Sequence, residues 1–173
     1  MAYDELVVGK LTLPPILEPE SEKIKSFMKT CQSAALAMLS SVSSTLGSDL
    51  SLHHRSSQTS DTALKLIAEP SLPLLSSVGE NKHTDSGTFT ILFYEEWGLH
   101  IKAKGEESWS FAAPKEGCAL VNVADSLERL SGGMLHSPTH RVTQPRDGAH
   151  KRFYLSYFLR PEHALKAAWA RET

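Results

Sequence analysis

His83 and Asp85 lie two positions apart, and a third residue that can bind a metal ion, His140, follows on a later segment. Two imidazoles and one carboxylate can occupy one triangular face of an octahedral ion and leave its other positions free, which is how proteins hold a non-haem ferrous ion. In an extended strand alternate side chains point the same way, so His83 and Asp85 are expected to share a face. His140 falls on another expected strand, which a barrel or sandwich can place in the facing sheet. The three residues together predict a metal site, although an HxD pair by itself is a weak signal.

The length and composition bound the kind of protein that carries these residues. A chain of 173 residues is about the size of one domain, and we expect one domain over residues 1–173. Charged residues make up 22% and the formal net charge is -2, so there is no basic field to attract nucleic acid. The longest apolar stretches, such as residues 34–39, are far shorter than the roughly 20 residues that span a bilayer. The two cysteines, Cys31 and Cys118, are too few for a disulfide framework and are expected to be reduced and buried. We therefore expect a soluble, cytoplasmic protein with neither a nucleic-acid nor a membrane partner.

The N-terminal part of the chain predicts one long helix at about residues 20–46. Apolar residues recur there at three- and four-residue steps, which is typical of a helix packed on a sheet. Ser21 is a candidate N-cap, and Gly47 is expected to end the helix. The polar residues 48–61 show no periodicity and predict a flexible surface loop, whose two adjacent histidines are not expected to bind metal.

Residues 62–160 are expected to form a β core. They contain short runs rich in β-branched and aromatic residues, separated by glycine, proline and charged turns. The seven expected strands are residues 63–68, 88–95, 99–103, 109–112, 119–123, 140–142 and 152–159. Short strands at this spacing favour a sandwich or a barrel over alternating strands and helices. Pro161 is expected to open a short C-terminal helix at about 162–171.

Residues 81–161 contain the segments NKHTDSGTFTILF, WGLHIK, EGCALVNVADSLERLSGG, SPTHRV and RFYLSYFLRP. In these segments, and in LTLPP, the long helix and TALKLIAEP before them, the chain resembles the isopenicillin N synthase-like family of 2-oxoglutarate- and Fe(II)-dependent oxygenases, most of all its fungal members. The resemblance implies a mainly β fold with helices, in which one long packing helix precedes a double-stranded β-helix, or jelly roll. It also implies Fe(II), 2-oxoglutarate as cosubstrate, dioxygen, and oxidation of a small organic molecule, as in secondary metabolism. Hydroxylation, desaturation and ring closure are equally open.

The resemblance also assigns roles to individual residues. It implies that His83, Asp85 and His140 are the iron ligands, because they match the family's HTD and THRV positions. Arg152 matches the basic residue that pairs with the distal carboxylate of 2-oxoglutarate. A guanidinium suits that role, because it forms a planar, two-pronged and charge-assisted pair with a carboxylate.

Two positions depart from the family pattern around the cosubstrate. The family usually has a serine two residues after its arginine, whereas this chain has Tyr154. The phenol can donate the same hydrogen bond, and Ser156, further along the same strand face, offers a second hydroxyl. Glu69 stands where relatives commonly carry a tyrosine that touches the cosubstrate, and a carboxylate pointing inward there would repel a dianion.

Family members also carry an additional N-terminal portion, so the chain is expected to present the C-terminal catalytic region only. Bare barrel surface would favour a homo-oligomer or a partner chain. Two alternatives to an active oxygenase stay open: a non-oxidative or inactive descendant that binds a ligand or guides a rearrangement, and a fragment that docks with a partner chain. Asn122 and Asp125 in VNVAD are expected to fix the turn after a strand rather than to touch a substrate.

Overall fold

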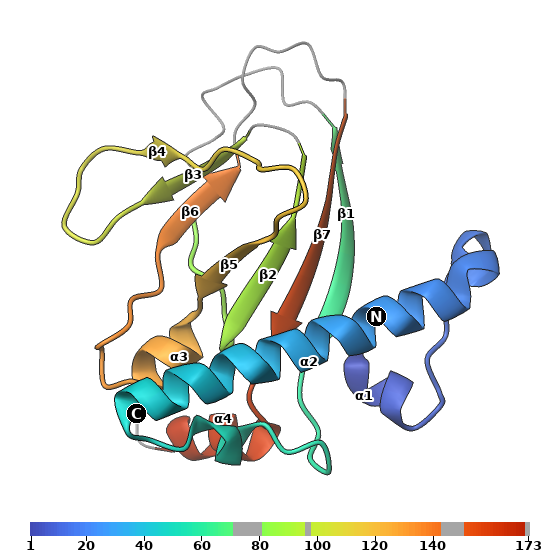
Figure 1. Cartoon of the computed structure of the whole chain (residues 1–173), viewed down its shortest axis with the longest axis horizontal. Coiled ribbons are helices and arrows are strands. Elements are labelled where there is room, and N and C mark those ends of the chain that lie inside the picture. The colour runs from blue at the N-terminus through green and yellow to red at the C-terminus, as the bar shows by residue number, and fades with distance from the viewer. Residues whose placement is uncertain (71–80, 96–97, 143–150, 172–173) are drawn as a thin grey trace.

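The computed structural model of this chain describes residues 1–70, 81–95, 98–142 and 151–171, without the side chains of residues 68–70 and 151–152. The strands of this described part form two antiparallel sheets with a cavity between them (Figure 1). The order in the larger sheet is β1 (Ala63–Pro70), β7 (Lys151–Leu159), β2 (Phe89–Phe93) and β5 (Leu120–Val123). The order in the smaller sheet is β4 (Ser110–Phe111), β3 (Leu99–Lys102) and β6 (Thr139–Val142).

Strands that are neighbours in these sheets come from distant parts of the chain. β1 pairs along its whole length with β7, from Ala63 opposite Phe158 to Pro70 opposite Lys151. The other side of β7 pairs with β2, which in turn pairs with β5. The predicted fold, a mainly β jelly roll preceded by one long helix, is confirmed. The first and last residues of each predicted strand lie within two residues of those of the corresponding observed strand. The extent of the single domain stays a prediction.

The helices lie outside the two sheets. The long helix α2 (Ser21–Leu46) crosses the outer face of the larger sheet (Figure 1). The shorter helices are α1 (Tyr3–Val7), η1 (Pro15–Glu20), η2 (Leu50–His53), α3 (Asp125–Leu130) and α4 (His163–Trp169). Helix α4 begins one residue later and ends two residues earlier than predicted. Within the described ranges, no helix combines the length and the apolarity needed to cross a bilayer.

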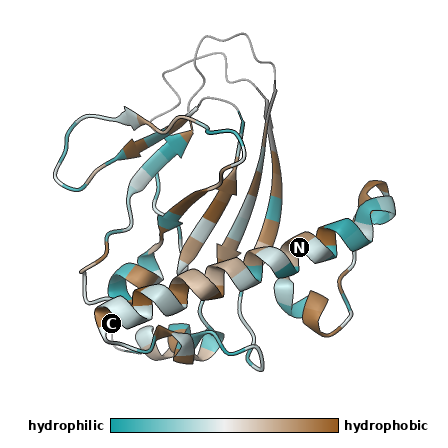
Figure 2. Ribbon diagram, in the orientation of Figure 1, coloured by the Kyte–Doolittle hydropathy of each residue, from teal (hydrophilic) through white to brown (hydrophobic). Residues whose placement is uncertain are grey.

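Helix α2 packs on the sheet through one narrow stripe. Its buried residues are Met28, Cys31, Ala35 and Leu39, which follow the three- and four-residue steps of a helix face. Burial raises the pKa of the Cys31 thiol to about 11, so this cysteine is a protonated core residue. Figure 2 shows the hydrophobic strand segments against which this stripe packs.

Specific contacts and end residues fix the helix on the sheet. The Tyr157 hydroxyl donates to Oε1 of Gln32 at 2.7 Å, and the rings of Phe27 and Phe93 lie 5.1 Å apart. Gly47 ends the helix with a φ of 66°, as predicted, because a left-handed residue is easiest without a Cβ.

Two details of the sequence prediction are wrong. Ser21 is the first helical residue rather than the N-cap, which is Glu20, and no side chain caps this end. Cys118 is exposed, whereas Cys31 is buried as predicted.

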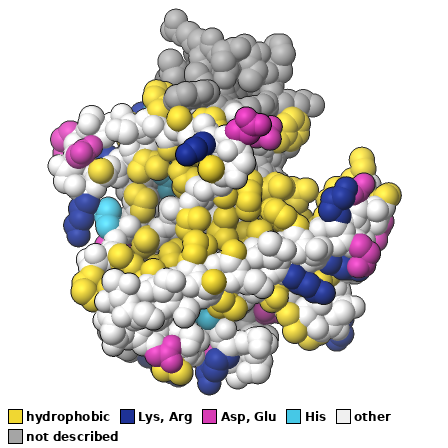
Figure 3. All heavy atoms as spheres, in the orientation of Figure 1, with side chains coloured by type: hydrophobic (Ala, Val, Ile, Leu, Met, Phe, Trp, Pro, Cys, Tyr) yellow, Lys and Arg dark blue, Asp and Glu magenta, His cyan; other side chains and the backbone are white. Residues whose placement is uncertain are grey.

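Part of the outer face of the larger sheet stays open. Leu66, Val121 and Phe153 are 44%, 41% and 62% exposed. In Figure 3 hydrophobic side chains gather beside α2 on this face of the molecule. Nothing in the described structure shows what covers them, so association with a second copy or a partner chain stays a prediction.

The segment predicted as a flexible loop, residues 48–61, holds the short helix η2 and is tied to the core. The ring of His54 donates from Nδ1 to the carbonyl of Leu50 at 3.1 Å, and its Nε2 lies 2.7 Å from the hydroxyl of Thr88. The guanidinium of Arg55 makes two hydrogen bonds, at 2.5 and 3.0 Å, to the buried carboxylate of Glu162. These long-range partners are not visible in the local sequence, which explains why the segment resembles a free loop.

The stripe on α2 predicts a contrast between two neighbouring alanines. Ala35 is fully buried against the sheet, whereas Ala34 is exposed. Ala35→Leu should lower the free energy of unfolding by about 1–3 kcal/mol, because extra atoms have no room there. Ala34→Leu should change it by less than about 0.5 kcal/mol. Urea denaturation of the two variants measures the difference, and equal losses would show that α2 does not pack as described.

The partly buried His54 predicts a pH dependence of stability. Its burial lowers the pKa from the ordinary 6.5, because desolvation disfavours the charged ring. Below pH 6.5 the unfolded chain takes up this proton more readily than the folded chain, so stability falls as the pH falls. His54→Gln should remove this contribution, which is at most about 1.4 kcal/mol per pH unit, while His53→Gln should leave it in place. Denaturation midpoints between pH 5 and pH 8 test this, and identical slopes in both variants would contradict it.

Candidate metal centre

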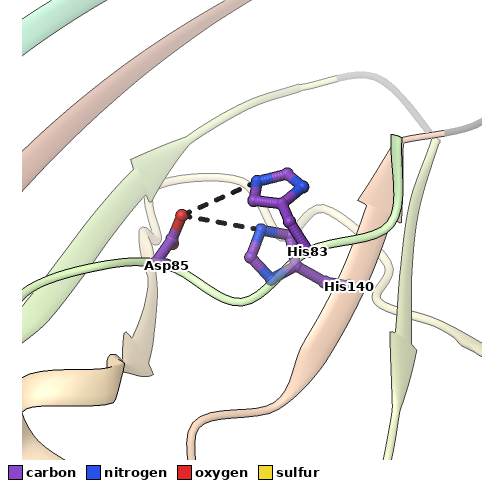
Figure 4. Close-up of side chains that lie close together, drawn as sticks. All are labelled: His83, Asp85 and His140. Carbon is purple, nitrogen blue, oxygen red and sulfur yellow. Dashed lines mark ion pairs between the residues drawn. The ribbon is translucent and has the colours of Figure 1, made fainter. Parts of the chain in front are cut away.

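Three side chains that can bind a metal converge on one side of the cavity between the sheets (Figure 4). One ligand atom from each of His83, Asp85 and His140 lies within 4.8 Å of the other two. Oδ1 of Asp85 is 3.8 Å from Nε2 of each histidine, and the two imidazole centroids are 4.4 Å apart. The fold therefore brings together the residues that the sequence singled out.

Backbone hydrogen bonds set the relative position of the two histidines. The N–H of His83 donates to the carbonyl of His140 at 3.0 Å, and the N–H of His140 donates back to the carbonyl of His83 at 2.9 Å. This isolated antiparallel bridge joins the segment before β2 to strand β6 of the smaller sheet. His83 and Asp85 do not lie in a regular strand, contrary to expectation, so the bridge rather than strand alternation aims the first histidine.

Each imidazole is held in the tautomer that a metal ligand needs. Nδ1 of His83 lies 2.7 Å from the carbonyl of Asn81, and Nδ1 of His140 lies 3.3 Å from the carbonyl of Pro138. A carbonyl oxygen only accepts hydrogen bonds, so both Nδ1 atoms carry the proton in the neutral ring. Both Nε2 atoms, the ones that face Asp85, then keep a lone pair.

The carboxylate of Asp85 is held by the neighbouring strand. Nδ2 of Asn122, in β5, donates to its Oδ2 at 3.1 Å, while Oδ1 faces the two histidines. The backbone carbonyl of Asp85 accepts from the N–H of Asp125 at 2.9 Å, at the start of α3. Asp125 is the first residue of α3 and its carboxylate accepts from the hydroxyl of Thr84, whereas Asn122 contacts the triad. Asp85 is 8% exposed, so its orientation depends on these partners.

The triad fits a divalent ion that keeps open coordination positions. With ligand bonds of about 2.1 Å at right angles, neighbouring ligand atoms lie about 3.0 Å apart. The two 3.8 Å separations would have to shorten by less than about 1 Å, and the separation between the two histidine ligand atoms, which is at most 4.8 Å, by less than about 2 Å. The side chain of His83 is 56% exposed, compared with 14% for His140. Access to the site is therefore from the side of His83.

A cavity of about 420 Å³ adjoins the triad and lies within the range of small-molecule sites. Both sheets supply its lining. The apolar walls are Ile67, Leu92, Leu99, Ile101, Leu120, Pro138, Val142 and Phe158. An organic molecule held between such walls and the triad would be shielded from water on most sides.

The residues expected to hold a cosubstrate lie on β7. Tyr154 and Ser156 are 9% and 4% exposed and line the same cavity as the triad. The ring of Tyr154 is part of the cavity wall. Arg152 lies opposite Glu69 in the pairing of β7 with β1, and the structure does not describe the side chain of either residue.

Sequence reasoning missed several polar residues of this cavity, and two of them lie on the strands of the larger sheet. Lys65 of β1 and Thr90 of β2 both line the cavity. Alternation along either strand places them on one face, but the sequence does not reveal which face is turned inward. Only the pairing register of the strands shows that both face inward. In it Lys65 is opposite Ser156, and Thr90 is opposite Asn122.

Comparisons with known proteins converge on one family. The family model for the 2OG-Fe(II) oxygenase superfamily matches residues 53–161. The 2-oxoglutarate-dependent dioxygenase frbH of a Dothideomycetidae species is 34% identical over 92% of this chain and 52% of that protein. The 2-oxoglutarate-dependent dioxygenase gloE of Glarea lozoyensis is 39% identical over 87% of this chain and 47% of that protein. The chain thus spans about half the length of the curated relatives it matches.

Solved structures share the fold at lower identity. A putative 2OG-Fe(II) oxygenase family protein from Caulobacter crescentus has a TM-score of 0.72 and 24% identity, over 87% of this chain and 50% of that one. The dioxygenase for auxin oxidation 1 of Arabidopsis thaliana, in complex with 2-oxoglutarate, has a TM-score of 0.72 and 20% identity, over 85% and 55%. At this identity the likeness concerns the fold alone.

The contact between Asn122 and Asp85 predicts an effect on metal affinity. Asn122→Ala should weaken the binding of Co(II) about 10- to 100-fold, because the carboxylate loses the donor that orients it. Gln58→Ala is a matched control, since it removes an exposed side-chain amide outside the cavity lining. Isothermal titration of the folded variants with Co(II) measures both affinities. Unchanged binding by Asn122→Ala would show that Asp85 needs no such support.

Proposed function

This chain belongs to the 2OG-Fe(II) oxygenase superfamily, and from that premise we propose that it oxidises a small organic molecule with Fe(II), 2-oxoglutarate and dioxygen. The observation that carries the proposal is the convergence of two Nε2 atoms and one carboxylate oxygen beside a cavity. Because the chain spans about half of its curated relatives, the activity of the whole protein is part of the proposal and not of the family assignment.

His83, Asp85 and His140 would hold the ferrous ion. Their donor set, two neutral imidazoles and one carboxylate, is the one that non-haem Fe(II) sites use, and it leaves three positions free. The carbonyls of Asn81 and Pro138 support this role, because they keep both Nδ1 atoms protonated. The burial of Asp85 supports it too, since a buried carboxylate is most stable next to positive charge.

Arg152, Tyr154 and Ser156 would hold 2-oxoglutarate through its distal carboxylate. Arg152 is placed in this role by its motif position, and its guanidinium would pair with the carboxylate in a two-pronged manner. Tyr154 and Ser156 support it, because both line the cavity and both carry a hydroxyl that can donate.

A bound ferrous ion would supply the redox chemistry, in which 2-oxoglutarate and dioxygen give succinate and carbon dioxide. The second oxygen atom would enter the substrate in a hydroxylation, or would leave as water with two hydrogen atoms of the substrate in a desaturation or ring closure. The residues of the chain do the rest. The apolar walls orient the substrate and exclude water. Asn122 and the two carbonyls keep the three ligands aimed at one point, and the exposed side of His83 leaves a path of entry.

The finer assignments belong to the same proposal. Within the superfamily we place the chain in the isopenicillin N synthase-like branch, on its HTD, THRV and RFYLS segments. The reaction would be hydroxylation, desaturation or ring closure of a metabolite in the cytoplasm. The fungal relatives support a role in secondary metabolism.

The proposal predicts a spectroscopic titration. Under anaerobic conditions the chain should bind one Fe(II) and then show the weak visible charge-transfer band of a chelated 2-oxo acid when 2-oxoglutarate is added. His140→Ala should lose the iron with the fold intact, because two ligands hold it poorly. Arg152→Ala should keep the iron and need a higher 2-oxoglutarate concentration for the band.

His136→Ala is the matched control, because His136 is paired with Glu128 outside the triad. Iron binding without the band would favour a non-oxidative descendant of the family. A folded chain that binds no iron would favour a fragment that docks with a partner. Stoichiometric iron in His140→Ala would remove that residue from the ligand set.

A further inference from the structure

Lys65 brings a positive charge to the cavity at a distance from the proposed cosubstrate end. It lies on the edge strand β1 opposite Ser156, and it lines the cavity while its side chain stays exposed to solvent. Its ammonium lies over the ring of Phe158, 5.2 Å from the centroid. Arg152 is opposite Glu69 four residues further along β1, about 13 Å away at the rise of an extended strand.

The other charged groups of the cavity are already engaged. Asp85 faces the two histidines and Asn122. The guanidinium of Arg160 donates to the carbonyl of Asp61 at 2.6 Å and to the carbonyl of Ser86 at 3.3 Å, and it lies 4.8 Å from the centroid of the Phe158 ring. Among the described residues no carboxylate pairs with Lys65, so its charge is available to a ligand.

A second polar group in the cavity also lacks a partner. Thr90 is 4% exposed, and its hydroxyl makes no hydrogen bond within the described part of the chain. Phe158 lies between the two groups, since it is paired with Thr90 on one side and its ring lies under the ammonium of Lys65 on the other. A buried hydroxyl without a partner is costly, so an occupant with polar atoms would stabilise it.

We propose that the organic substrate is a carboxylate with a mainly apolar body, and that the exposed ammonium of Lys65 binds its carboxylate at the β1 edge of the cavity. The body would pass beside Phe158 toward the triad, and the hydroxyl of Thr90 would donate to a polar group if the body carries one. This inference rests on the proposed function, because it names the substrate class of the same site. Lys65 is exposed, so its contribution is moderate, and we expect a preference of about 10-fold for a carboxylate over its amide.

A structural role for Lys65 is the competing explanation. A lysine on an edge strand protects that edge from pairing with another chain. Such a role predicts that loss of the charge promotes aggregation and leaves ligand preference unchanged. Gel filtration of the variants reports on the first property, and the binding experiment reports on the second.

The test uses matched pairs of probes: phenylacetate, 3-phenylpropionate and 4-phenylbutyrate, each with its primary amide. Isothermal titration is done on the chain with Fe(II) and saturating 2-oxoglutarate without oxygen, and again on the metal-free chain. At least one acid should bind about 10-fold more tightly than its amide. Lys65→Met should abolish the preference, and Lys65→Arg should keep it. Lys10→Met, which removes an exposed charge outside the cavity, should also keep it.

The proposal would be overturned if no acid is preferred to its amide, if the preference survives Lys65→Met, or if a probe competes with 2-oxoglutarate. A weaker affinity of Lys65→Met for 2-oxoglutarate would instead assign the residue to the cosubstrate and also overturn it. The metal-free arm separates this inference from the proposed function, because the preference should persist there and in Arg152→Ala even if the chain binds no iron.

Discussion

The candidate centre depends on one pair of backbone hydrogen bonds, the reciprocal bridge between His83 and His140. It joins the segment before β2 to the smaller sheet, so two imidazoles from distant parts of the chain are held side by side. The carbonyls two residues before each histidine then fix both rings in the same tautomer. With the bridge in place, Asp85 needs only to follow the chain for two residues to complete the triad. The backbone geometry thus sets the positions of the three candidate ligand side chains.

The larger sheet serves two purposes because side chains alternate along its strands. On β7, Tyr157 faces outward and bonds to Gln32 of α2, whereas Ser156 and Phe158 face the cavity. The packing of α2 therefore stabilises the same strands that carry the cavity wall. A substitution in the stripe of α2 would reach the site through the position of β7, without touching any ligand residue.

The charged groups that line the cavity lie at different places around it. The buried carboxylate is next to the two imidazoles, the guanidinium of Arg160 is bound to backbone carbonyls, and the ammonium of Lys65 is exposed at the β1 edge. An anionic ligand would meet positive charge at the β1 edge and at any metal ion that the triad holds. The long apolar walls between these points favour a molecule that carries its charge at one end.

The sequence by itself determined the periodic features: the long helix, all seven strands and the residue types of the triad. The periods of helices and strands are local properties of the chain. The residue types of the triad can be read directly from the HTD and THRV segments. Only the tertiary structure decided what depends on pairing. The contact of Asn122 with Asp85 requires β5 to lie beside β2, the anchoring of residues 48–61 requires partners such as Thr88 and Glu162, and the inward position of Lys65 requires the register of β1 on β7. Register and long-range contacts arise from how the sheets close around a shared cavity, and no local stretch of sequence contains that information.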